Sequence, residues 1–275
     1  LDATNIISKK ICSIITPISL DHQEYLGDTI KKITKEKLGI VKKNDFVLIS
    51  NQEKEVKDFI KKNLINKNNV FFYGKHFKIG KINKNNFEFK FGNNINVVDR
   101  PKLNGEHQIE NASVALAFAE IIKQKKFRLN SIKTSKAIKK TSWPGRLEIL
   151  NYGNKKIILD GSHNVGGAKI LYTFLNSNKL RPVVLFGMLN NKKIDIFLKI
   201  IKNQIKSILA IKIPNEKNAF LSNKIAKECK ELSISCIEIK NINEALKKIS
   251  VSNEKYFLVT GSLYLVGKIR GRFIS

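Results

Sequence analysis

The sequence predicts an α/β fold whose C-terminal half is a Rossmann-like, doubly wound domain. Short apolar segments alternate with longer charged segments along most of the 275 residues, which is the pattern of β–α–β units around a parallel sheet. Several of these apolar segments end directly in polar residues, at the position where open α/β sheets bind ligands. Residues 75–98 differ, because aromatic residues alternate there with Gly and Asn, which indicates a small antiparallel region.

In the N-terminal half, three apolar segments are expected to form strands, at residues 11–18, 45–50 and 70–73. Helices are expected after the first two strands, and the first of these helices should carry Lys37 near its end. Beyond the antiparallel region, residues 105–111 open a helix rich in alanine, and a second helix is expected over residues 131–140. Pro144-Gly145 then interrupts the chain, so we place a domain boundary there, between residues 1–145 and 146–275.

The C-terminal half repeats the alternation regularly. Strands are expected at residues 157–159, 183–186, 207–211, 236–239 and 256–259, and helices at residues 168–176, 193–205, 223–230 and 242–250. Its first strand is not followed by the Gly-x-Gly-x-x-Gly motif, so a dinucleotide is not implied.

Composition narrows the class of protein. The formal net charge of +28 allows a nucleic-acid partner, but the lysines are spread along the whole chain and arginine, the usual base reader, is scarce. The three cysteines form no Cys-x-x-Cys pair, which fits buried thiols in a reducing cytoplasm. No apolar run approaches the roughly 20 residues of a membrane span. We therefore expect a cytoplasmic protein that binds neither nucleic acid nor membrane.

Two residues near the first strand suggest a metal and phosphate site. His22 directly follows the predicted strand. A histidine at such a position is usually a structural hydrogen bonder, but the adjacent Asp21 and the position at the strand end make a metal ligand about equally favoured. Lys37 considered alone is a solvated charge on a helix face.

Four further positions are candidates in the second half and at the boundary. Asp160 follows an apolar strand and either caps the next helix or holds a ribose hydroxyl or Mg²⁺. Ser262, in Thr-Gly-Ser after another strand, suits an anionic group or acts as a plain helix cap. Arg146 follows Pro-Gly and could clamp a phosphate. Asn111 lies four residues after His107, so the two share a helix face.

Together these segments resemble the folylpolyglutamate synthase and dihydrofolate synthase family, relatives of the Mur ligases. Six blocks occur in the family order and span the whole chain: LDATN (1–5), SLDHQEYLGDTIKKITKEKLGI (19–40), GEHQIENA (105–112), WPGRLE (143–148), LDGSHN (159–164) and VTGSLYLVG (259–267). The resemblance implies that residues 1–145 are the C-terminal part of a P-loop-type ATPase domain and that residues 146–275 are the glutamate-ligase domain.

The resemblance also implies an activity. ATP would phosphorylate a carboxylate of dihydropteroate or of a folate γ-glutamyl tail, and the amine of L-glutamate would then displace phosphate from the acyl phosphate. Mg²⁺ would offset the charge of phosphoryl transfer. We expect a monomer that acts on these small molecules.

Family roles can be carried over residue by residue. His22 matches the Mg²⁺ ligand, and Lys37 matches a lysine carbamylated by CO₂, whose oxygens would suit a hard cation. Three residues match ATP contacts (Asn111, Arg146, Asp160), three match part of the dihydropteroate site (Leu1, Asp2, Ala3), and two belong to motifs near ATP or glutamate (His163, Ser262).

The sequence departs from the family in two larger ways. The Gly-rich phosphate-binding loop and the metal-binding Glu that precedes LDATN are both missing from these 275 residues. The chain opens on Leu1 and its single methionine is Met188, so we expect coding sequence upstream. Without that loop the triphosphate lacks its cradle of N–H groups, and we expect the 275-residue chain alone to be inactive.

Three alternatives stay open at the level of sequence. The first is a Mur-type ligase acting on a nucleotide-linked muropeptide, against which LDATN and GSLYLVG favour the folate branch. The second is a basic nucleic-acid-binding protein, and the third is a non-catalytic remnant.

Overall fold

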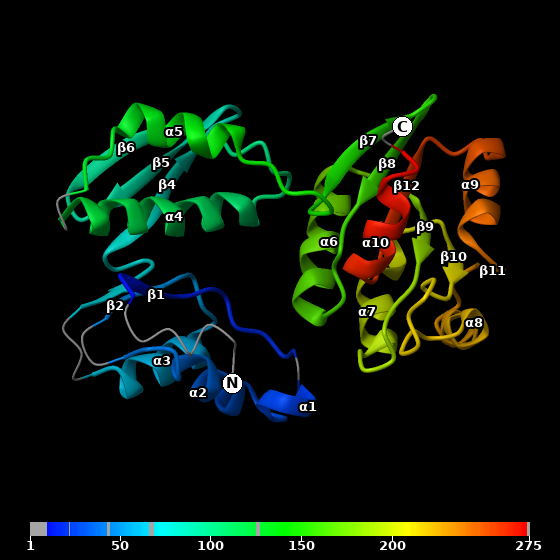
Figure 1. Ribbon diagram of the computed structural model, residues 1–275, viewed down its shortest axis with the longest axis horizontal. Helices are drawn as coiled ribbons and strands as arrows, with labels where there is room; N and C mark the ends of the chain where they lie inside the picture. Colours follow the sequence, from blue (N-terminus) through cyan, green and yellow to red (C-terminus); the bar gives the residue numbers. More distant parts are fainter. Residues whose placement is uncertain (1–9, 22, 43–44, 66–68, 125–126, 274–275) are drawn as a thin grey trace. The chain divides into compact units, whose positions relative to one another are not determined.

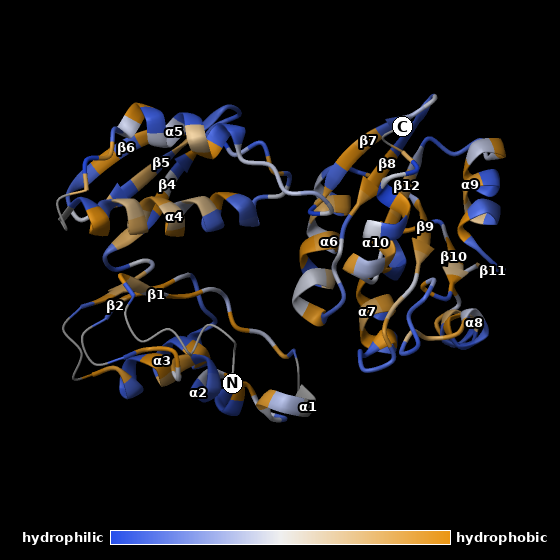
Figure 2. Ribbon diagram, viewed as in Figure 1, coloured by the Kyte–Doolittle hydropathy of each residue, from blue (hydrophilic) through white to orange (hydrophobic). Residues whose placement is uncertain are grey.

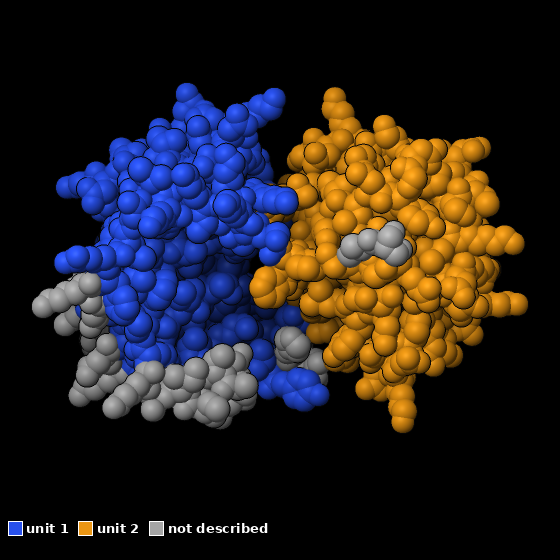
Figure 3. Space-filling view, turned by 45° about the horizontal axis from the view of Figure 1, so that its top comes forward, with its two compact units in different colours: residues 1–102, 106–142 blue, residues 103–105, 143–275 orange. Residues whose placement is uncertain are grey.

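The protein is described by a computed structural model that covers residues 10–21, 23–42, 45–65, 69–124 and 127–273. The chain divides into two compact units, coloured separately in Figure 3. Unit 1 comprises Leu1–Lys102 and Glu106–Ser142, and unit 2 comprises Leu103–Gly105 and Trp143–Ser275. Both units combine strands and helices, as the α/β prediction requires (Figure 1).

Unit 1 begins with a three-stranded parallel sheet. Its strands are adjacent in chain order, β1 (Cys12–Ile15), β2 (Phe46–Ile49) and β3 (Val70–Phe72). Three helices accompany it, α1 (Gln23–Leu26), α2 (Ile30–Leu38) and α3 (Lys54–Asn63). Ile33 of α2 and Ile60 of α3 pack with Ile49 in one core, each of them fully buried. The alternation of apolar and charged residues in these helices places the apolar face on the sheet.

The predicted antiparallel region is a three-stranded sheet made of β4 (Phe77–Ile82), β5 (Asn86–Phe91) and β6 (Asn94–Asp99). Helices α4 (His107–Gln124) and α5 (Ser131–Lys140) accompany this sheet in Figure 1. Phe87 and Phe89 alternate into the core and meet the small residues of α4, such as the fully buried Ala117. The alanines therefore allow close packing of α4 on the aromatic face.

Unit 2 is built on a six-stranded sheet with the order β11-β10-β9-β12-β8-β7. The strands are β7 (Glu148–Tyr152), β8 (Lys155–Leu159), β9 (Val183–Phe186), β10 (Ser207–Ile211), β11 (Cys236–Ile239) and β12 (Tyr256–Thr260). All neighbouring pairs are parallel except β7 with β8. The last strand, β12, is inserted between β8 and β9, so the carboxyl ends of β8 and β12 lie side by side.

Helices cover both faces of this sheet. One face packs against α6 (Val165–Ser177), α7 (Ile194–Ile201) and α8 (Ser222–Glu231), and the other against α9 (Ile242–Val251) and α10 (Leu263–Arg270). The central strands are apolar along their length (Figure 2), as expected for a sheet buried on both faces.

Several predicted boundaries are wrong. The single helix expected after the first strand, with Lys37 near its end, is two helices, α1 and α2, because Gly27 takes a φ of +102° between them. The first strand is shorter than residues 11–18, since it ends before Pro17, which has no N–H to pair. The helix expected over residues 193–205 ends at Ile201 and continues as a 3-10 turn, Lys202–Gln204.

Candidate functional site

The candidate site in unit 2 lies where β8 and β12 end. We call this region, residues 160–164 and 260–262, the β8/β12 strand mouth. Leu159 of β8 pairs with Val259 of β12, and the N–H of Asp160 donates to the carbonyl oxygen of Val259 at 3.0 Å. The N–H of Gly261 donates to the carbonyl oxygen of Ser162, also at 3.0 Å. The two predicted motifs, LDGSHN and VTGSLYLVG, are thus held together by backbone hydrogen bonds.

Asp160 is buried, with 5% of its surface exposed. One carboxylate oxygen accepts the N–H of Leu147 and the other accepts the N–H of Ser162, each at 3.0 Å. It does not cap α6, because the cap is Asn164, whose side-chain oxygen accepts the N–H of Gly167 at 2.8 Å. The carboxylate of Asp160 therefore organises backbone on two sides.

The turn after β12 is tightly packed. Gly261 has a φ of +100°, and a Cβ at this position would lie 2.5 Å from the carbonyl oxygen of Gly187. The next residue, Ser262, is 3% exposed and caps α10, since its hydroxyl accepts the N–H of Tyr264 at 3.1 Å. The structure therefore shows the plain helix-cap role for Ser262, and a role near ATP or glutamate stays a prediction.

His163 and Arg146 border the same region. Nδ1 of His163 lies 2.9 Å from the carbonyl oxygen of Gly161. Because a carbonyl can only accept, Nδ1 carries the proton and Nε2 is the basic nitrogen of the neutral ring. Arg146 is half-buried, and the carbonyl oxygen of the preceding Gly145 accepts the N–H of Gly161 at 2.9 Å.

Two predicted site residues belong to unit 1. Asn111 is exposed near the start of α4, and its amide donates to Gln108, whose own amide lies 2.9 Å from Nε2 of His107. The expected shared helix face of His107 and Asn111 is therefore present, bridged by Gln108. Lys37 is exposed in the last turn of α2.

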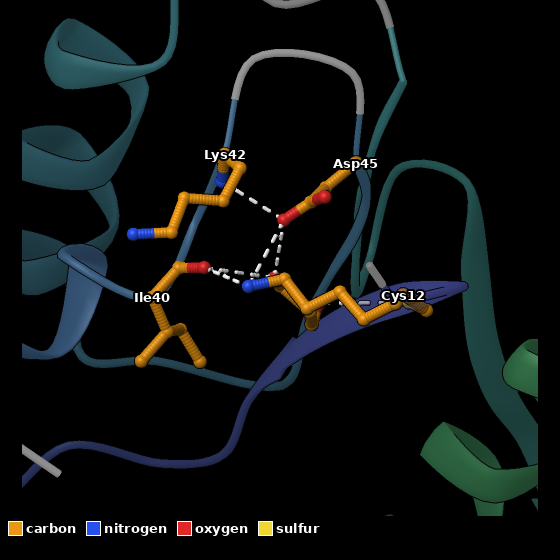
Figure 4. Close-up of polar contacts among 6 residues, drawn as sticks. Cys12, Ile40, Lys42 and Asp45 are labelled. Atoms are coloured by element: carbon orange, nitrogen blue, oxygen red, sulfur yellow. Dashed lines mark hydrogen bonds and ion pairs between the residues drawn. The ribbon is translucent and has the colours of Figure 1, made fainter. Parts of the chain in front are cut away.

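The segment that follows α2, the helix that carries Lys37, is held by a polar cluster around Asp45 (Figure 4). One oxygen of the Asp45 carboxylate accepts the N–H of Lys42 and the hydroxyl of Ser13, both at 2.8 Å, and lies 3.3 Å from the ammonium of Lys10. Lys10 also donates to the carbonyl oxygen of Ile40. Burial alone raises the pKa of Asp45, but the hydrogen bonds from Lys42, Ser13 and Lys10 outweigh it and hold that pKa below its ordinary value.

Other predicted residues lie outside the described part of the chain, namely the metal ligand His22 and the dihydropteroate contacts Leu1, Asp2 and Ala3. Among the residues that the structure describes, no group of three His, Cys, Asp or Glu side chains could hold a metal ion. Within the same residues, no helix is long and apolar enough to cross a membrane.

Sequence reasoning missed three residues around Arg146. Asn104 donates to the carbonyl oxygen of Leu147 at 2.8 Å across 43 residues of sequence. Glu148 is bound in a bidentate manner by Arg270, with three contacts between 2.8 and 3.1 Å across 122 residues. No local pattern marks pairs this far apart, although Glu148 does lie inside the WPGRLE block.

Comparison with known proteins identifies the family. Residues 5–119 match the Mur ligase middle domain, and residues 146–272 match the dihydrofolate synthetase C-terminal domain. A probable dihydrofolate synthetase of Schizosaccharomyces pombe is 31% identical over 97% of this chain and 67% of its own length.

Solved structures agree with these matches. Folylpolyglutamate synthase of Thermotoga maritima is 27% identical with a TM-score of 0.78, and the match covers 100% of this chain and 63% of that one. E. coli FolC in complex with DHPP and ADP shares the fold at 19% identity, with a TM-score of 0.84 over 99% of this chain and 63% of that one. The chain thus spans about two thirds of the length of these relatives, and it belongs to the dihydrofolate synthetase and folylpolyglutamate synthase family.

Proposed function

We propose that this chain is part of an ATP-dependent ligase that joins L-glutamate to dihydropteroate or to the γ-carboxylate of folates. The observation that supports this most is the β8/β12 strand mouth, because two adjacent parallel strands end there in hydrogen-bonded motifs beside Arg146. The carboxyl ends of strands are where open α/β sheets bind ligands. Two of the relatives named above are a probable dihydrofolate synthetase and a folylpolyglutamate synthase, and the E. coli FolC structure is a complex with DHPP and ADP.

The proposed reaction has two steps. A carboxylate oxygen of the pterin substrate attacks the γ-phosphorus of ATP, forming an acyl phosphate and releasing ADP. The amine of L-glutamate then attacks the acyl carbon, the C–O bond breaks, and inorganic phosphate leaves with the amide formed. The first step converts a poor leaving group into a good one, which is why ATP is consumed.

Within unit 2, Arg146 and His163 are assigned different tasks. The guanidinium of Arg146 contacts the phosphates of ATP, for which its planar, permanently charged fork is suited. The Nδ1–H···O bond to Gly161 sets the tautomer of His163 in which Nε2 is basic. His163 belongs to the LDGSHN motif, which we assign to the glutamate and ATP site. Its Nε2 would accept the proton that the glutamate amine loses when the amide forms.

The remaining assignments rest on the family resemblance alone. Asn111 and Asp160 are proposed to contact ATP, Ser262 to lie near glutamate or ATP, and Leu1, Asp2 and Ala3 to contact dihydropteroate. His22 and a carbamate on Lys37 are proposed to hold Mg²⁺, which would offset phosphate charge when bound. Among the described residues, no three His, Cys, Asp or Glu side chains are grouped around a possible metal position.

The 275 residues contain no Gly-x-x-x-x-Gly-Lys-[Ser/Thr] motif. We therefore expect no ligation by this chain alone, and ligation by a chimera in which it replaces the matched two thirds of the S. pombe protein. Each preparation is incubated with ATP, Mg²⁺, labelled glutamate and dihydropteroate, and the product is identified by mass spectrometry. Product from the isolated chain would overturn the expected inactivity.

The same chimera tests the ligase proposal itself. If it folds but makes no product from dihydropteroate or a folate, while binding a nucleotide-linked muropeptide in a thermal-shift assay, then the Mur-type alternative is correct. An Arg146→Ala chimera should lose at least about tenfold in kcat/KM for ATP, as expected for a lost charged phosphate contact. Unchanged kinetics would remove Arg146 from the ATP site.

A further inference from the structure

Arg146 lies on an unusual piece of backbone, which we call the Arg146 loop (Gly145–Glu148). The residues on either side of Arg146 both have left-handed φ values, +71° for Gly145 and +49° for Leu147. Leucine rarely adopts this conformation, because its Cβ approaches the following carbonyl oxygen. Strained backbone of this kind persists only where the surroundings hold it in place.

Leu147 is held at three points. Its N–H donates to the buried carboxylate of Asp160, and its carbonyl oxygen accepts the side-chain amide of Asn104 at 2.8 Å. Its side chain is 1% exposed and packs in the core beside Ile158. Both backbone polar groups of Leu147 and its side chain are therefore fixed at once.

The other end of the loop is held by an ion pair. The N–H of Gly145 donates to the Glu148 carboxylate at 2.9 Å, and Arg270 of α10 donates two hydrogen bonds to the same carboxylate, each at 2.8 Å. The hydrogen bond to Arg270 is the main reason that the pKa of Glu148 lies below its ordinary value. The carbonyl oxygen of Gly145 is bound as well, by the N–H of Gly161.

We propose that Asn104 and the Glu148–Arg270 pair are positioning residues that hold the backbone of Arg146 in its binding conformation. The inference rests on the proposed contact between Arg146 and the phosphates of ATP. A guanidinium on a mobile loop would lose entropy on binding the phosphates, whereas one on a fixed backbone has already lost part of it. Nucleotide affinity should therefore depend on side chains that never touch the nucleotide.

The experiment uses the full chain with Asn104→Ala, and with Asn151→Ala as a matched control. Asn151 is an exposed asparagine of β7 in the same unit, and its side-chain oxygen accepts a hydrogen bond from the ammonium of Lys156 at 2.7 Å. Two quantities are measured. One is the ¹⁵N order parameter of the Arg146 amide, and the other is the affinity for ADP by calorimetry, with and without Arg146→Ala.

In the wild-type protein the Arg146 amide should have the order parameter of rigid backbone, about 0.85, and Asn104→Ala should lower it toward 0.6. Asn104→Ala should weaken ADP binding about 5- to 10-fold when Arg146 is present and less than about 2-fold when it is alanine, since coupled residues give non-additive effects. Asn151→Ala should change neither quantity. Glu148→Gln keeps the shape of the side chain and should behave like Asn104→Ala.

Two results would overturn the inference. The first is an unchanged Arg146 order parameter in both Asn104→Ala and Glu148→Gln. The second is an equal loss of ADP affinity with and without Arg146, which indicates a general structural effect. If the isolated wild-type chain binds no ADP, the same affinities are measured in the S. pombe chimera, which restores the missing loop. If the chimera binds no ADP either, the proposed nucleotide contact fails, and the order parameters alone decide whether Asn104 and Glu148 fix the loop.

Discussion

At the scale of single residues, the structure assigns structural work to side chains that the sequence marks as ligands. Asp160 uses both carboxylate oxygens to accept backbone N–H groups, and Ser262 uses its hydroxyl as a helix cap. Where strands end, the sheet leaves backbone N–H groups without hydrogen-bond partners, and short polar side chains can supply the acceptors. Residues in such motifs can therefore carry structure and ligand binding together.

Asp160→Asn should lower the free energy of unfolding by roughly 1.5–3 kcal/mol, the range for a hydrogen bond to a charged group. The NH₂ group of asparagine would face the N–H of either Leu147 or Ser162, and since both groups are donors, that backbone N–H would lose its hydrogen bond. Urea unfolding followed by circular dichroism measures the change. Asp195→Asn, an exposed acid in the first turn of α7, is the control and should cost less than about 1 kcal/mol. Equal costs at both positions would contradict the role given to Asp160.

Asp45 should make part of the stability pH-dependent. Its pKa is lower in the folded protein than the ordinary aspartate value of about 3.9. A depressed carboxylate pKa stabilises the fold above the unfolded-state pKa, and this stabilisation is lost as the pH falls through the folded-state value. Asp45→Asn should therefore cost roughly 1–3 kcal/mol at pH 7 and progressively less below about pH 4. A wild-type minus variant difference that is constant from pH 7 to pH 3 would contradict this.

At the scale of elements, local sequence patterns predicted the bounds of helices and strands correctly where the segment is regular. Helix α5 and strands β9, β10 and β11 have the predicted bounds, because their periodicity and flanking turns are strong. The predictions failed where a single backbone feature interrupts the pattern, as at Gly27 and Pro17. Strand β7 was not predicted, since it pairs antiparallel at the edge of the sheet and follows the boundary signal directly.

The cap of α6 is a testable element-scale feature. Asn164→Ala should destabilise unit 2 by about 1 kcal/mol, because the N–H of Gly167 loses its acceptor. Asn241→Ala is a matched change, since Asn241 caps α9 in the same way, with the N–H of Glu244 at 3.0 Å. The two variants should be equally destabilised in thermal unfolding. A much larger loss for Asn164 would show that it does more than cap.

At the scale of the whole molecule, the apolar cores respect the division into two units. Two of the buried clusters lie in unit 1 and two in unit 2. Each unit therefore buries its own apolar surface, which is the main favourable contribution to folding. The net charge of +28 is distributed over both units and gives no separate indication of function.

Residues 143–275 expressed alone should unfold in urea in one cooperative transition, because both faces of the six-stranded sheet are covered within that segment. The comparison is with residues 165–275, which lack β7 and β8. Removing β8 leaves the backbone N–H and C=O groups along one edge of the buried strand β12 unpaired, so this shorter piece should show no cooperative transition. A featureless unfolding curve for residues 143–275 would contradict the independence of unit 2.

The sequence by itself determined the family, the α/β class and most of the strands and helices, because motifs and periodicity are local properties of the chain. It also marked Arg146, Asp160, His163 and Ser262, and all four proved to line or border the β8/β12 strand mouth. Only the tertiary structure decided how these residues are held. Asn104 reaches Leu147 across 43 residues and Arg270 reaches Glu148 across 122. Such contacts depend on how the sheet and its helices pack, and no local pattern in the chain encodes that packing.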